Sequence, residues 1–511
     1  MTKQLFVCQT IKRVQHCAHR KGSVVYVQIV IIFIINLFQV HSLFICESIS
    51  STFELVSYFL IIYISYTLNQ QIRKRFIEFF FSKNITVLNH NYKMWSPKLF
   101  CSKIITKNTA LICRNLSSSG SKNQVVIVSA TRTPIASFRS SFAPLSAPQL
   151  GSIAIKNAIE KAGLSNDQVD EVLMGNVMQA GQMQAPTRQA ALGAGLPNKV
   201  ITTTINKVCA SGMKSVMVAA QILACGHQDI IVAGGMESMS NVPYYLKRGE
   251  TPYGGVKLDD GIVHDGLTDA YKYIHMGNCA ENTAKKFGIT RQQQDEYAIN
   301  SYKRSAAAIQ NKIIEKEIIP VVIPGKKGAP DTIVNEDEEY KRVHFNKFAS
   351  LPTVFQRENG TVTAANASTL NDGAAACVLM TSKTAEKLGK KPLARIIGFQ
   401  DAAVDPIDFP ISPAAAIPKL LETNGINKQD ISMWEINEAF SVVVLANIKL
   451  LDIDPSKVNV NGGAVSLGHP LGMSGARLVN ILALQLKPGQ YGVAGICNGG
   501  GGASSILIQK L

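Results

Sequence analysis

The 511-residue sequence predicts an α/β fold built from two similar halves, in which layers of helices cover β-sheets. Short apolar, β-branched stretches alternate with stretches of helical periodicity along most of the chain. Two distant segments also look like copies, Cys209-Ala-Ser-Gly-Met213 and His469-Pro-Leu-Gly-Met473. Each precedes an apolar helical pattern and then a strand-like segment that ends in glycine, 230–235 and 491–495. We therefore predict an internal duplication that places a cysteine and a histidine at corresponding positions.

The N-terminal region differs in composition from the rest. Val24–Cys46 lacks Lys, Arg, Asp and Glu and is long enough to span a membrane. Residues 94–122 are basic, contain serines and lack acidic residues, as transit peptides do. We predict that translation starts at Met94, that 94–122 form a mitochondrial transit peptide, and that 1–93 come from an over-extended gene model. A membrane segment formed by 1–93 is the alternative.

The net charge of +16 is concentrated in this leader. Residues 1–120 hold 14 basic and 3 acidic residues, a net charge of +11, and the remainder holds 38 basic and 33 acidic residues, a net charge of +5. The body therefore gives no indication of a nucleic-acid partner. Its five cysteines are widely spaced and do not resemble a disulfide framework, and no C-x-x-C or H-x-x-x-H pair suggests a zinc site. A reducing compartment fits this cysteine usage.

The N-terminal half is predicted to span 123–390. Its expected elements are a buried strand at 124–130, a helix at 147–162, a strand at 172–176, a helix at 185–194, and a strand at 200–206 that leads into a helix after Cys209. Such sheets place functional groups at the carboxyl ends of strands, where Cys209 lies. Proximity to a helix N-terminus also favours ionisation of its thiol.

Between about 237 and 368 the alternating pattern loosens. An amphipathic helix is expected around 281–312, and a charged segment follows at 335–343. Because a stretch of this length is too long for a structureless loop, we predict an inserted lid or substrate-binding subdomain.

The C-terminal half is predicted to span 391–511. It is expected to begin with a strand near 392–398, and 434–440 is expected to open a buried helix after a strand-like start. Glycines surround His469 and also follow Cys497. Residues without side chains let the backbone approach a ligand and present N–H groups to developing negative charge.

Four segments together resemble the signature blocks of the thiolase family. They are, in order, Val208-Cys-Ala-Ser-Gly-Met-Lys214, Asn437-Glu-Ala-Phe440, Gly462-Gly-Ala-Val-Ser-Leu-Gly-His-Pro470 and Cys497-Asn-Gly-Gly-Gly-Gly502. The resemblance covers about 123–511 and implies a layered α-β-α-β-α arrangement of duplicated halves. It also implies an acyltransferase that condenses two acetyl-CoA into acetoacetyl-CoA and CoA, or thiolyses acetoacetyl-CoA and 2-methylacetoacetyl-CoA, without a redox cofactor.

The resemblance assigns roles to five residues. Cys209 is the expected nucleophile that carries the acetyl group, and His469 takes its proton. Cys497 is the acid or base that acts on the α-carbon of the second substrate. His469 and a water held by Asn437 are expected to bind the enolate oxygen, and the N–H groups of Cys209 and Gly499 the tetrahedral oxygen. Individually, a buried cysteine is usually a core residue, and Asn437 is compatible with a helix cap.

Contacts with CoA and a cation are also implied by the resemblance. The expected CoA-binding residues are Tyr302, Arg342, Val343, His344, Lys347 and Ser368. His344 stands where the family pattern has Asp. The expected potassium ligands are Tyr302, Ala364, Ala365, Ala367 and Val465, and the expected walls of a short acyl pocket are His275-Met276 and Phe409-Pro410.

The resemblance further implies a homotetramer of the mitochondrial matrix that acts in fatty-acid, ketone-body and isoleucine metabolism. The alternative function is a non-catalytic, thiolase-like carrier of acyl chains or lipids. The presence of both cysteines, His469 and Asn437 favours the enzyme over the carrier. A membrane partner would follow only if residues 1–93 are translated.

Overall fold

A computed structural model of the chain describes residues 123–250, 252–325 and 328–511. The predicted leader segments 1–93 and 94–122 lie outside the described residues. Among the described residues, no helix is long and apolar enough to cross a membrane.

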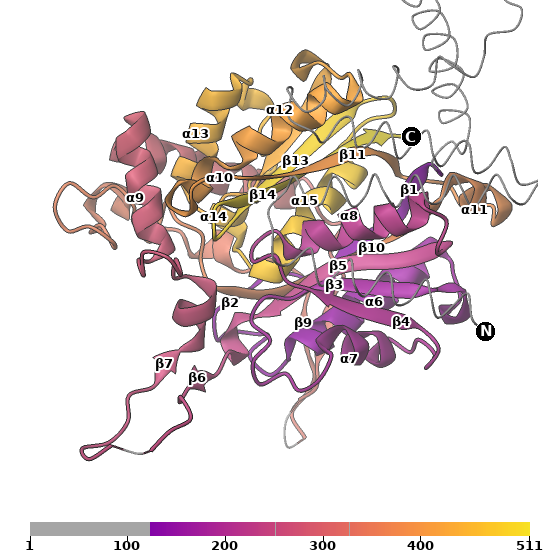
Figure 1. Cartoon of the computed structure of the whole chain (residues 1–511), viewed down its shortest axis with the longest axis horizontal. Helices are drawn as coiled ribbons and strands as arrows, with labels where there is room; N and C mark the ends of the chain where they lie inside the picture. The colour runs from indigo at the N-terminus through magenta and orange to yellow at the C-terminus, as the bar shows by residue number, and fades with distance from the viewer. Residues whose placement is uncertain (1–122, 251, 326–327) are drawn as a thin grey trace, which may run out of the picture. The chain divides into compact units, whose positions relative to one another are not determined.

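The strands of both halves form one ten-stranded mixed sheet (Figure 1). Its strands are β1 (Val125–Arg132), β2 (Ala136–Ser137), β3 (Glu171–Gly175), β4 (Ile201–Ile205), β5 (Ile230–Ser238), β10 (Asn371–Thr381), β11 (Ala394–Ala403), β12 (Ile431–Ile436), β13 (Tyr491–Asn498) and β14 (Gly502–Lys510). Their order is β12-β13-β14-β11-β1-β10-β5-β3-β4, and β2 pairs with β10. The halves meet at β1 and β11, which pair through only two residue pairs.

The two halves have the same topology. In the N-terminal half, β3 lies parallel to both β4 and β5, while β10 is antiparallel to β5 and β1. In the C-terminal half, β12 and β13 are parallel, and β14 is antiparallel to β13 and β11. A parallel bridge from Trp434 to Val458 occupies the position of β4. The predicted duplication of α/β halves is therefore confirmed.

The helices form layers around these strands. They are α6 (Ala147–Ala162), α7 (Pro186–Gly193), α8 (Ser211–Ala224), α9 (Met276–Phe287), α10 (Arg291–Gln310), α11 (Ser382–Lys387), α12 (Pro413–Asn424), α13 (Ser441–Leu451), α14 (Ala464–Leu467) and α15 (Leu471–Gln485). Helix α6 packs on strands of the N-terminal half and α12 on strands of the C-terminal half, while α8 and α15 contact strands of both (Figure 1).

Small residues let α8 and α15 approach each other closely in the central layer. A Cβ atom on Gly212 would lie 2.5 Å from the carbonyl oxygen of Gly472, and one on Gly475 would lie 2.5 Å from the main-chain nitrogen of Met213. Apolar residues of both helices, such as Val216 and Leu478, then share one buried core. This contact brings the two duplicated segments, and with them the two helix N-termini, together.

Two sequence predictions about helices were wrong. The helix predicted around 281–312 is two helices, because Gly288 adopts a left-handed conformation with φ of +63° at the end of α9, and Thr290 caps the start of α10. The helix predicted to open within 434–440 begins only at Ser441, since Trp434–Ile436 belong to β12 and pair with β13.

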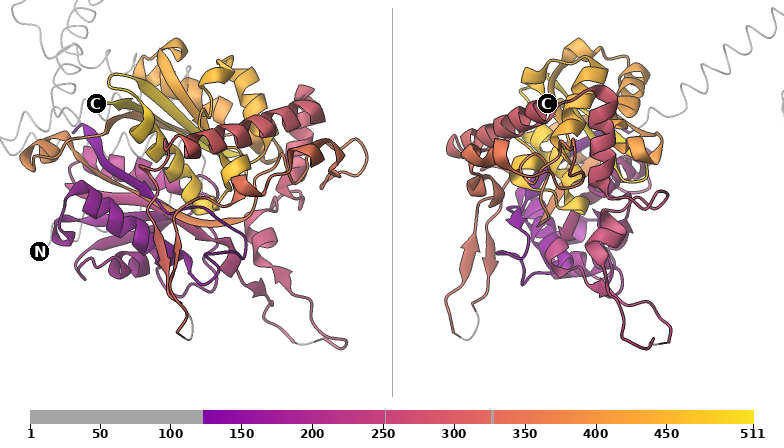
Figure 2. Two further views of the ribbon diagram at one scale, coloured as in Figure 1. Left: turned by 180° about the vertical axis from the view of Figure 1, so that it is seen from behind. Right: turned by 90° about the vertical axis from the view of Figure 1, so that its left-hand side faces the viewer.

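The region predicted as an insertion contains α9, α10 and two short hairpins. The hairpins are formed by β6 (Tyr244–Tyr245) with β7 (Asp259–Asp260), and by β8 (Val321–Ile323) with β9 (Thr332–Val334). Figure 2 shows that both hairpins project away from the main sheet. Helices α9 and α10 instead pack beside α13.

Candidate active site

The segment that carries Cys209 is a strained turn between β4 and α8. Cys209 is buried and lies two residues before α8, as predicted. Val208 has φ of +48°, a conformation that β-branched residues rarely adopt. The Asn206 Oδ1 atom accepts a hydrogen bond from the Val208 N–H at 3.0 Å, and the Ser211 hydroxyl accepts one from the Lys207 N–H at 2.8 Å. Turns that are held in such conformations occur preferentially at functional sites.

The ionisation of Cys209 differs from the sequence prediction. Burial raises the pKa of the thiol to about 12, although a hydrogen bond from the Gly499 N–H partly opposes this effect, and the nearby charge of Glu237 raises the pKa further. The predicted ease of ionisation is therefore wrong, because burial removes water from the thiol and disfavours its charged form. Cys209 needs a base to become a nucleophile.

The hydrogen bonds around His469 define its tautomer. Its Nδ1 atom lies 2.6 Å from the Ser474 hydroxyl oxygen, and this hydroxyl donates to the Pro470 carbonyl at 2.9 Å. With the single hydroxyl hydrogen directed to Pro470, Nδ1 carries the ring proton and Nε2 keeps its lone pair, which faces the side-chain nitrogen of Asn437. Burial, together with the charge of Arg477, lowers the pKa of His469 to about 3, so the ring is neutral. A buried, neutral imidazole with a free Nε2 is a suitable base.

Asn437 directly follows β12 and lies beside this histidine. Its side-chain nitrogen is 3.4 Å from His469 Nε2, and its Oδ1 atom is buried without a hydrogen-bond partner among the described residues. The alternative that Asn437 caps a helix is wrong, because the residue preceding α13 is Phe440. A buried amide oxygen without a partner is suited to hold an ordered water.

Cys497 lies at the end of β13, next to Cys209. Burial raises the pKa of the Cys497 thiol above its ordinary value, and its proximity to Cys209 adds to this effect. Gly499 follows in the turn to β14, and a Cβ there would lie 3.6 Å from both Val208 and Met276. The structure thus brings both predicted cysteines and the Gly499 N–H to one place.

Sequence reasoning missed Glu438, which anchors the segment that carries Asn437. Its carboxylate accepts hydrogen bonds from the hydroxyls of Tyr297 and Ser301, both at 2.7 Å, and from the Val465 N–H at 3.0 Å. The sequence shows only an acidic residue inside the motif Asn437-Glu-Ala-Phe440, and this residue by itself gives no sign of these partners. Ser474 was missed as well, because it touches His469 only after α15 has formed.

The predicted CoA-binding residues lie along α10 and the segments after it. Tyr302 is buried and packs against Phe348 and Val343. The side chains of Arg342, His344 and Lys347 are exposed. The Ser368 N–H and hydroxyl both donate to the Ala439 carbonyl, at 3.1 and 2.9 Å, so Ser368 adjoins the segment that carries Asn437.

The predicted potassium ligands are partly brought together. Tyr302, Ala365 and Val465 belong to one packed cluster, and Ala367 forms a bridge with Phe440. Among the described residues, no group of three or more His, Cys, Asp or Glu side chains is placed to hold a metal ion. The proposed set therefore depends on the Tyr302 hydroxyl and on main-chain carbonyl oxygens, which are hard ligands of the kind that alkali cations accept.

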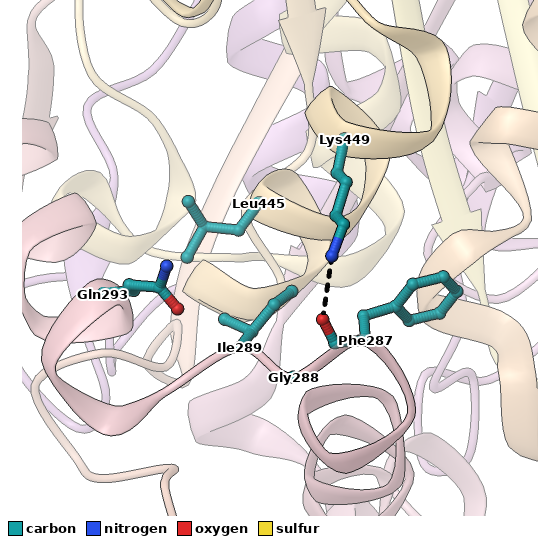
Figure 3. Close-up of a pocket in the computed structure, with 6 residues that line it drawn as sticks. All are labelled: Phe287, Gly288, Ile289, Gln293, Leu445 and Lys449. Carbon is teal, nitrogen blue, oxygen red and sulfur yellow. Dashed lines mark hydrogen bonds between the residues drawn. The ribbon is translucent and has the colours of Figure 1, made fainter.

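A surface hollow of about 180 Å³ lies elsewhere, between α9, α10 and α13 (Figure 3). It is lined by Phe287, Gly288, Ile289, Gln293, Leu445 and Lys449. The Lys449 ammonium donates to the Phe287 carbonyl at 3.1 Å and so satisfies the end of α9. None of the predicted site residues lines this hollow.

Comparison with known proteins identifies the family of this chain. Residues 125–383 match the model of the thiolase N-terminal domain, and 390–510 match that of the thiolase C-terminal domain. The chain belongs to the thiolase family. Among curated thiolases, "Acetyl-CoA acetyltransferase A, mitochondrial" of Xenopus laevis is 68% identical over 398 residues, which are 78% of this chain and 94% of that protein. The human "Acetyl-CoA acetyltransferase, mitochondrial" is 66% identical over 398 residues, 78% of this chain and 93% of that protein.

Solved structures of thiolases are similar to the structure of this chain. The Acat5 thiolase of Ascaris suum, crystallised in complex with coenzyme A, has a TM-score of 0.73 and 48% identity, over 76% of this chain and all of that one. The Bacillus anthracis acetyl-CoA acetyltransferase has a TM-score of 0.74 and 37% identity, over 77% of this chain and all of that one. The predicted family, fold and enzyme class, an acyltransferase, are therefore confirmed, and the comparisons favour catalysis over the non-catalytic carrier.

The tautomer assignment predicts a defect in this thiolase when Ser474 is replaced. In Ser474→Ala, the His469 Nδ1–H loses its acceptor and the ring can adopt either tautomer. We expect kcat to fall by about 10²-fold, less than the about 10⁴-fold that an enforced wrong tautomer causes in a serine protease. Steady-state assays of both reaction directions measure the effect. Ser441→Ala is the control, since that buried hydroxyl has no hydrogen-bond partner among the described residues, and equal activities of the two variants would contradict the assignment.

Stability of the thiolase is expected to depend on pH through the same groups. His469 has an ordinary pKa near 6.5 and a folded pKa of about 3, so below pH 6.5 the unfolded chain binds a proton that the folded chain excludes. The contribution of His469 to the free energy of unfolding therefore decreases as pH falls from 6.5 toward 3, whereas the carboxyls of Glu237 and Glu435, whose pKa values burial raises to about 7 and about 8, contribute in the opposite direction. For Cys209 the pKa rises from 9 to about 12, so stability also decreases above pH 9. Urea denaturation at constant protein concentration measures the free energy of unfolding in both pH ranges. If this free energy falls as steeply below pH 6.5 in His469→Gln as in the natural chain, His469 is not the group responsible.

Proposed function

We propose that the chain catalyses reversible acetyl transfer between CoA thioesters, condensing two acetyl-CoA to acetoacetyl-CoA and CoA through an acetyl-Cys209 intermediate. The observation that carries this proposal is a pair of neighbouring buried thiols in a fold that also holds a buried, neutral imidazole beside Asn437. Cys209 and Cys497 are neighbours, the Gly499 N–H lies against Cys209, and the unprotonated Nε2 of His469 faces the side-chain nitrogen of Asn437 at 3.4 Å.

In the first half-reaction, the Cys209 proton moves to His469 Nε2 and the thiolate attacks the acetyl-CoA carbonyl. The N–H groups of Cys209 and Gly499 stabilise the negative oxygen, a contribution that is typically worth about 10²- to 10³-fold in rate per donor. CoA leaves as a thiolate and takes a proton from the Cys497 thiol. The products are acetyl-Cys209, protonated His469, a Cys497 thiolate and free CoA.

In the second half-reaction, the Cys497 thiolate removes a proton from the α-carbon of a second acetyl-CoA. Burial raises the pKa of Cys497, so its thiolate is a strong base. The enolate oxygen accepts hydrogen bonds from protonated His469 Nε2 and from a water held by Asn437. The carbanion attacks the acetyl group, and Cys209 leaves as a thiolate paired with protonated His469.

Binding of CoA is proposed to involve Tyr302, Arg342, Val343, His344, Lys347 and Ser368. The exposed cations Arg342 and Lys347 are suited to the phosphates of the nucleotide. A potassium ion is proposed at Tyr302, Ala364, Ala365, Ala367 and Val465, where it would order the segment after Thr361 next to the CoA. Stimulation of activity by potassium over sodium at equal ionic strength tests this ion.

A short acyl substrate is proposed from the apolar walls around Cys497. Cys497 belongs to a packed cluster that also contains Met276, Phe409 and Phe440. The ring of His275 stacks on that of Phe355, with 4.7 Å between the ring centroids. Aromatic walls that are held by packing leave little room for long chains. Acetoacetyl-CoA and 2-methylacetoacetyl-CoA are therefore the proposed thiolysis substrates.

A homotetramer in the mitochondrial matrix is proposed from exposed surfaces and from the relatives. Strand β4 is an edge strand of β-branched residues without Pro or charge, and Ile201 on it is 51% exposed. The β6–β7 hairpin exposes Tyr244 and Leu258. The relatives are named mitochondrial. Light scattering coupled to gel filtration measures the oligomeric state.

The test of this function is peptide mapping of the protein after brief mixing with acetyl-CoA. An acetyl group on Cys209 that free CoA removes is the expected result. Folded protein that binds CoA but never becomes acetylated would instead support the carrier.

A further inference from the structure

A buried carboxylate, Glu237, lies between the nucleophile segment and the helix that follows His469. We infer that Glu237 is a positioning residue that fixes Cys209 and His469 relative to each other across the two halves of the fold. This inference rests on the proposed function, because it concerns the geometry of that reaction.

Each carboxylate oxygen of Glu237 accepts two hydrogen bonds. The residue lies near the end of β5, and its side chain is fully buried. One carboxylate oxygen accepts hydrogen bonds from the Asn176 amide at 2.9 Å and from the Met178 N–H at 3.2 Å. The other accepts from the Val177 N–H at 3.0 Å and from the Gly472 N–H at 2.8 Å. One carboxylate therefore joins the segment after β3 to the first turn of α15.

The bond to Gly472 links Glu237 to the base. Gly472 is the second residue of α15, so its N–H lies at the positive end of that helix, where a carboxylate is favourable. His469 is three residues earlier and Ser474, which holds its ring, is two residues later. A Cβ on Gly472 would lie 2.9 Å from the Glu237 oxygen, so this close approach depends on glycine.

The bond to Val177 links Glu237 to the nucleophile. The Val177 carbonyl accepts a hydrogen bond from the Asn206 side-chain nitrogen at 3.0 Å, and the Asn206 oxygen accepts the Val208 N–H at 3.0 Å. Val208 is the strained residue that precedes Cys209. A short chain of hydrogen bonds therefore runs from the turn of Cys209 through Glu237 to the helix of His469.

The charge of Glu237 does not help to activate the nucleophile. Its negative charge raises the pKa of Cys209, which disfavours the thiolate. Burial raises the pKa of Glu237 itself to about 7, although its four hydrogen bonds oppose this shift. Because the electrostatic effect on Cys209 is unfavourable, the contribution of Glu237 to catalysis must be geometric.

Glu237→Gln tests the inference. Glutamine has the same shape, but its NH₂ group replaces one of the two carboxylate oxygens and cannot accept a hydrogen bond. The two hydrogen bonds made by that oxygen are therefore lost. We expect kcat to fall by about 10- to 10²-fold, as for small misplacements of reacting groups, with KM for acetyl-CoA nearly unchanged. Acetylation of Cys209 and condensation should slow together. The pKa of Cys209, measured from the pH dependence of its alkylation, should stay constant or fall.

Glu317→Gln is the matched control. Glu317 is equally buried, it accepts a hydrogen bond from Arg132 Nε at 2.9 Å, and it contacts none of the proposed site residues through this bond. Both variants should lose stability, but only Glu237→Gln should lose kcat. A wild-type kcat in folded Glu237→Gln, or a loss explained by a higher pKa of Cys209, would overturn the inference.

Glu237→Asp covers the case in which Glu237→Gln does not fold. Aspartate keeps the charge but withdraws the carboxylate by one methylene, so a smaller decrease of kcat with unchanged KM is expected, and wild-type kcat would overturn the inference. Acetylation of the natural chain separates the two proposals. If the natural chain is never acetylated, the proposed function fails, whereas an acetylated natural chain with an unimpaired Glu237 variant rejects the positioning role alone.

Discussion

Replacing Cys209 with alanine is expected to abolish turnover in both directions. Alanine has no nucleophile, and the other nearby thiol, Cys497, has a pKa raised by burial and lies on β13 rather than before α8. Removal of a covalent nucleophile lowers kcat by about 10⁶-fold in serine proteases, and a loss of this order is expected here. Thiolysis of acetoacetyl-CoA, followed by the disappearance of the substrate, measures it.

The control for this variant is Cys225→Ala. Cys225 is exposed at the end of α8 and lies outside the site, so its replacement should leave kcat unchanged. Calorimetric titration with CoA should show that Cys209→Ala still binds the cofactor portion of the substrate. Residual turnover above about one-hundredth of the natural rate would mean that acetyl transfer does not depend on Cys209.

Replacing Cys497 with alanine is expected to separate the two half-reactions. Cys209 and His469 keep their contacts, so acetylation of Cys209 should proceed, with CoA taking its proton from solvent. Without the second thiol, no group removes the α-proton, and condensation should fall by about 10²- to 10⁴-fold, the usual contribution of a general base. Mass spectrometry follows the acetyl-enzyme, and formation of acetoacetyl-CoA follows condensation.

Cys279→Ala is the matched control for this second variant. Cys279 is buried in the same apolar cluster as Cys497, and burial raises its pKa to about 11, but it belongs to α9. Its replacement should affect stability more than either half-reaction. Equal losses of acetylation and condensation in Cys497→Ala would contradict the division of labour between the two thiols.

The order of the elements and the likeness of the two halves were accessible from the sequence. The pattern after Cys209 and the pattern after His469 each predict a helix followed by a strand, and the structure has α8 before β5 and α15 before β13. The helix at 147–162 was predicted with its observed bounds, because Ser146 and Gly163 cap it locally. The helix break at Gly288 was missed because amphipathic periodicity continues across it.

Part of the candidate site was accessible as well. Four separated motifs were enough to predict the thiolase family, and the structure places Cys209, Cys497 and Gly499 together. The connecting residues Glu237, Glu438 and Ser474 were not predicted. Each acts through partners that are distant in sequence or one helical turn away, and an isolated acidic residue or serine in an apolar segment carries no signal of such a partner.

By itself, the sequence determined the family, the duplicated α/β architecture and the identity of the reactive side chains, because these depend on residue type and on local periodicity. Only the tertiary structure decided the protonation states and the tautomer of these side chains. Burial makes Cys209 a weak acid despite its helix N-terminus, and the bond from His469 to Ser474 selects the tautomer. Proton affinities and hydrogen bonds depend on which groups surround a residue in space, and those neighbours come from both halves of the folded chain.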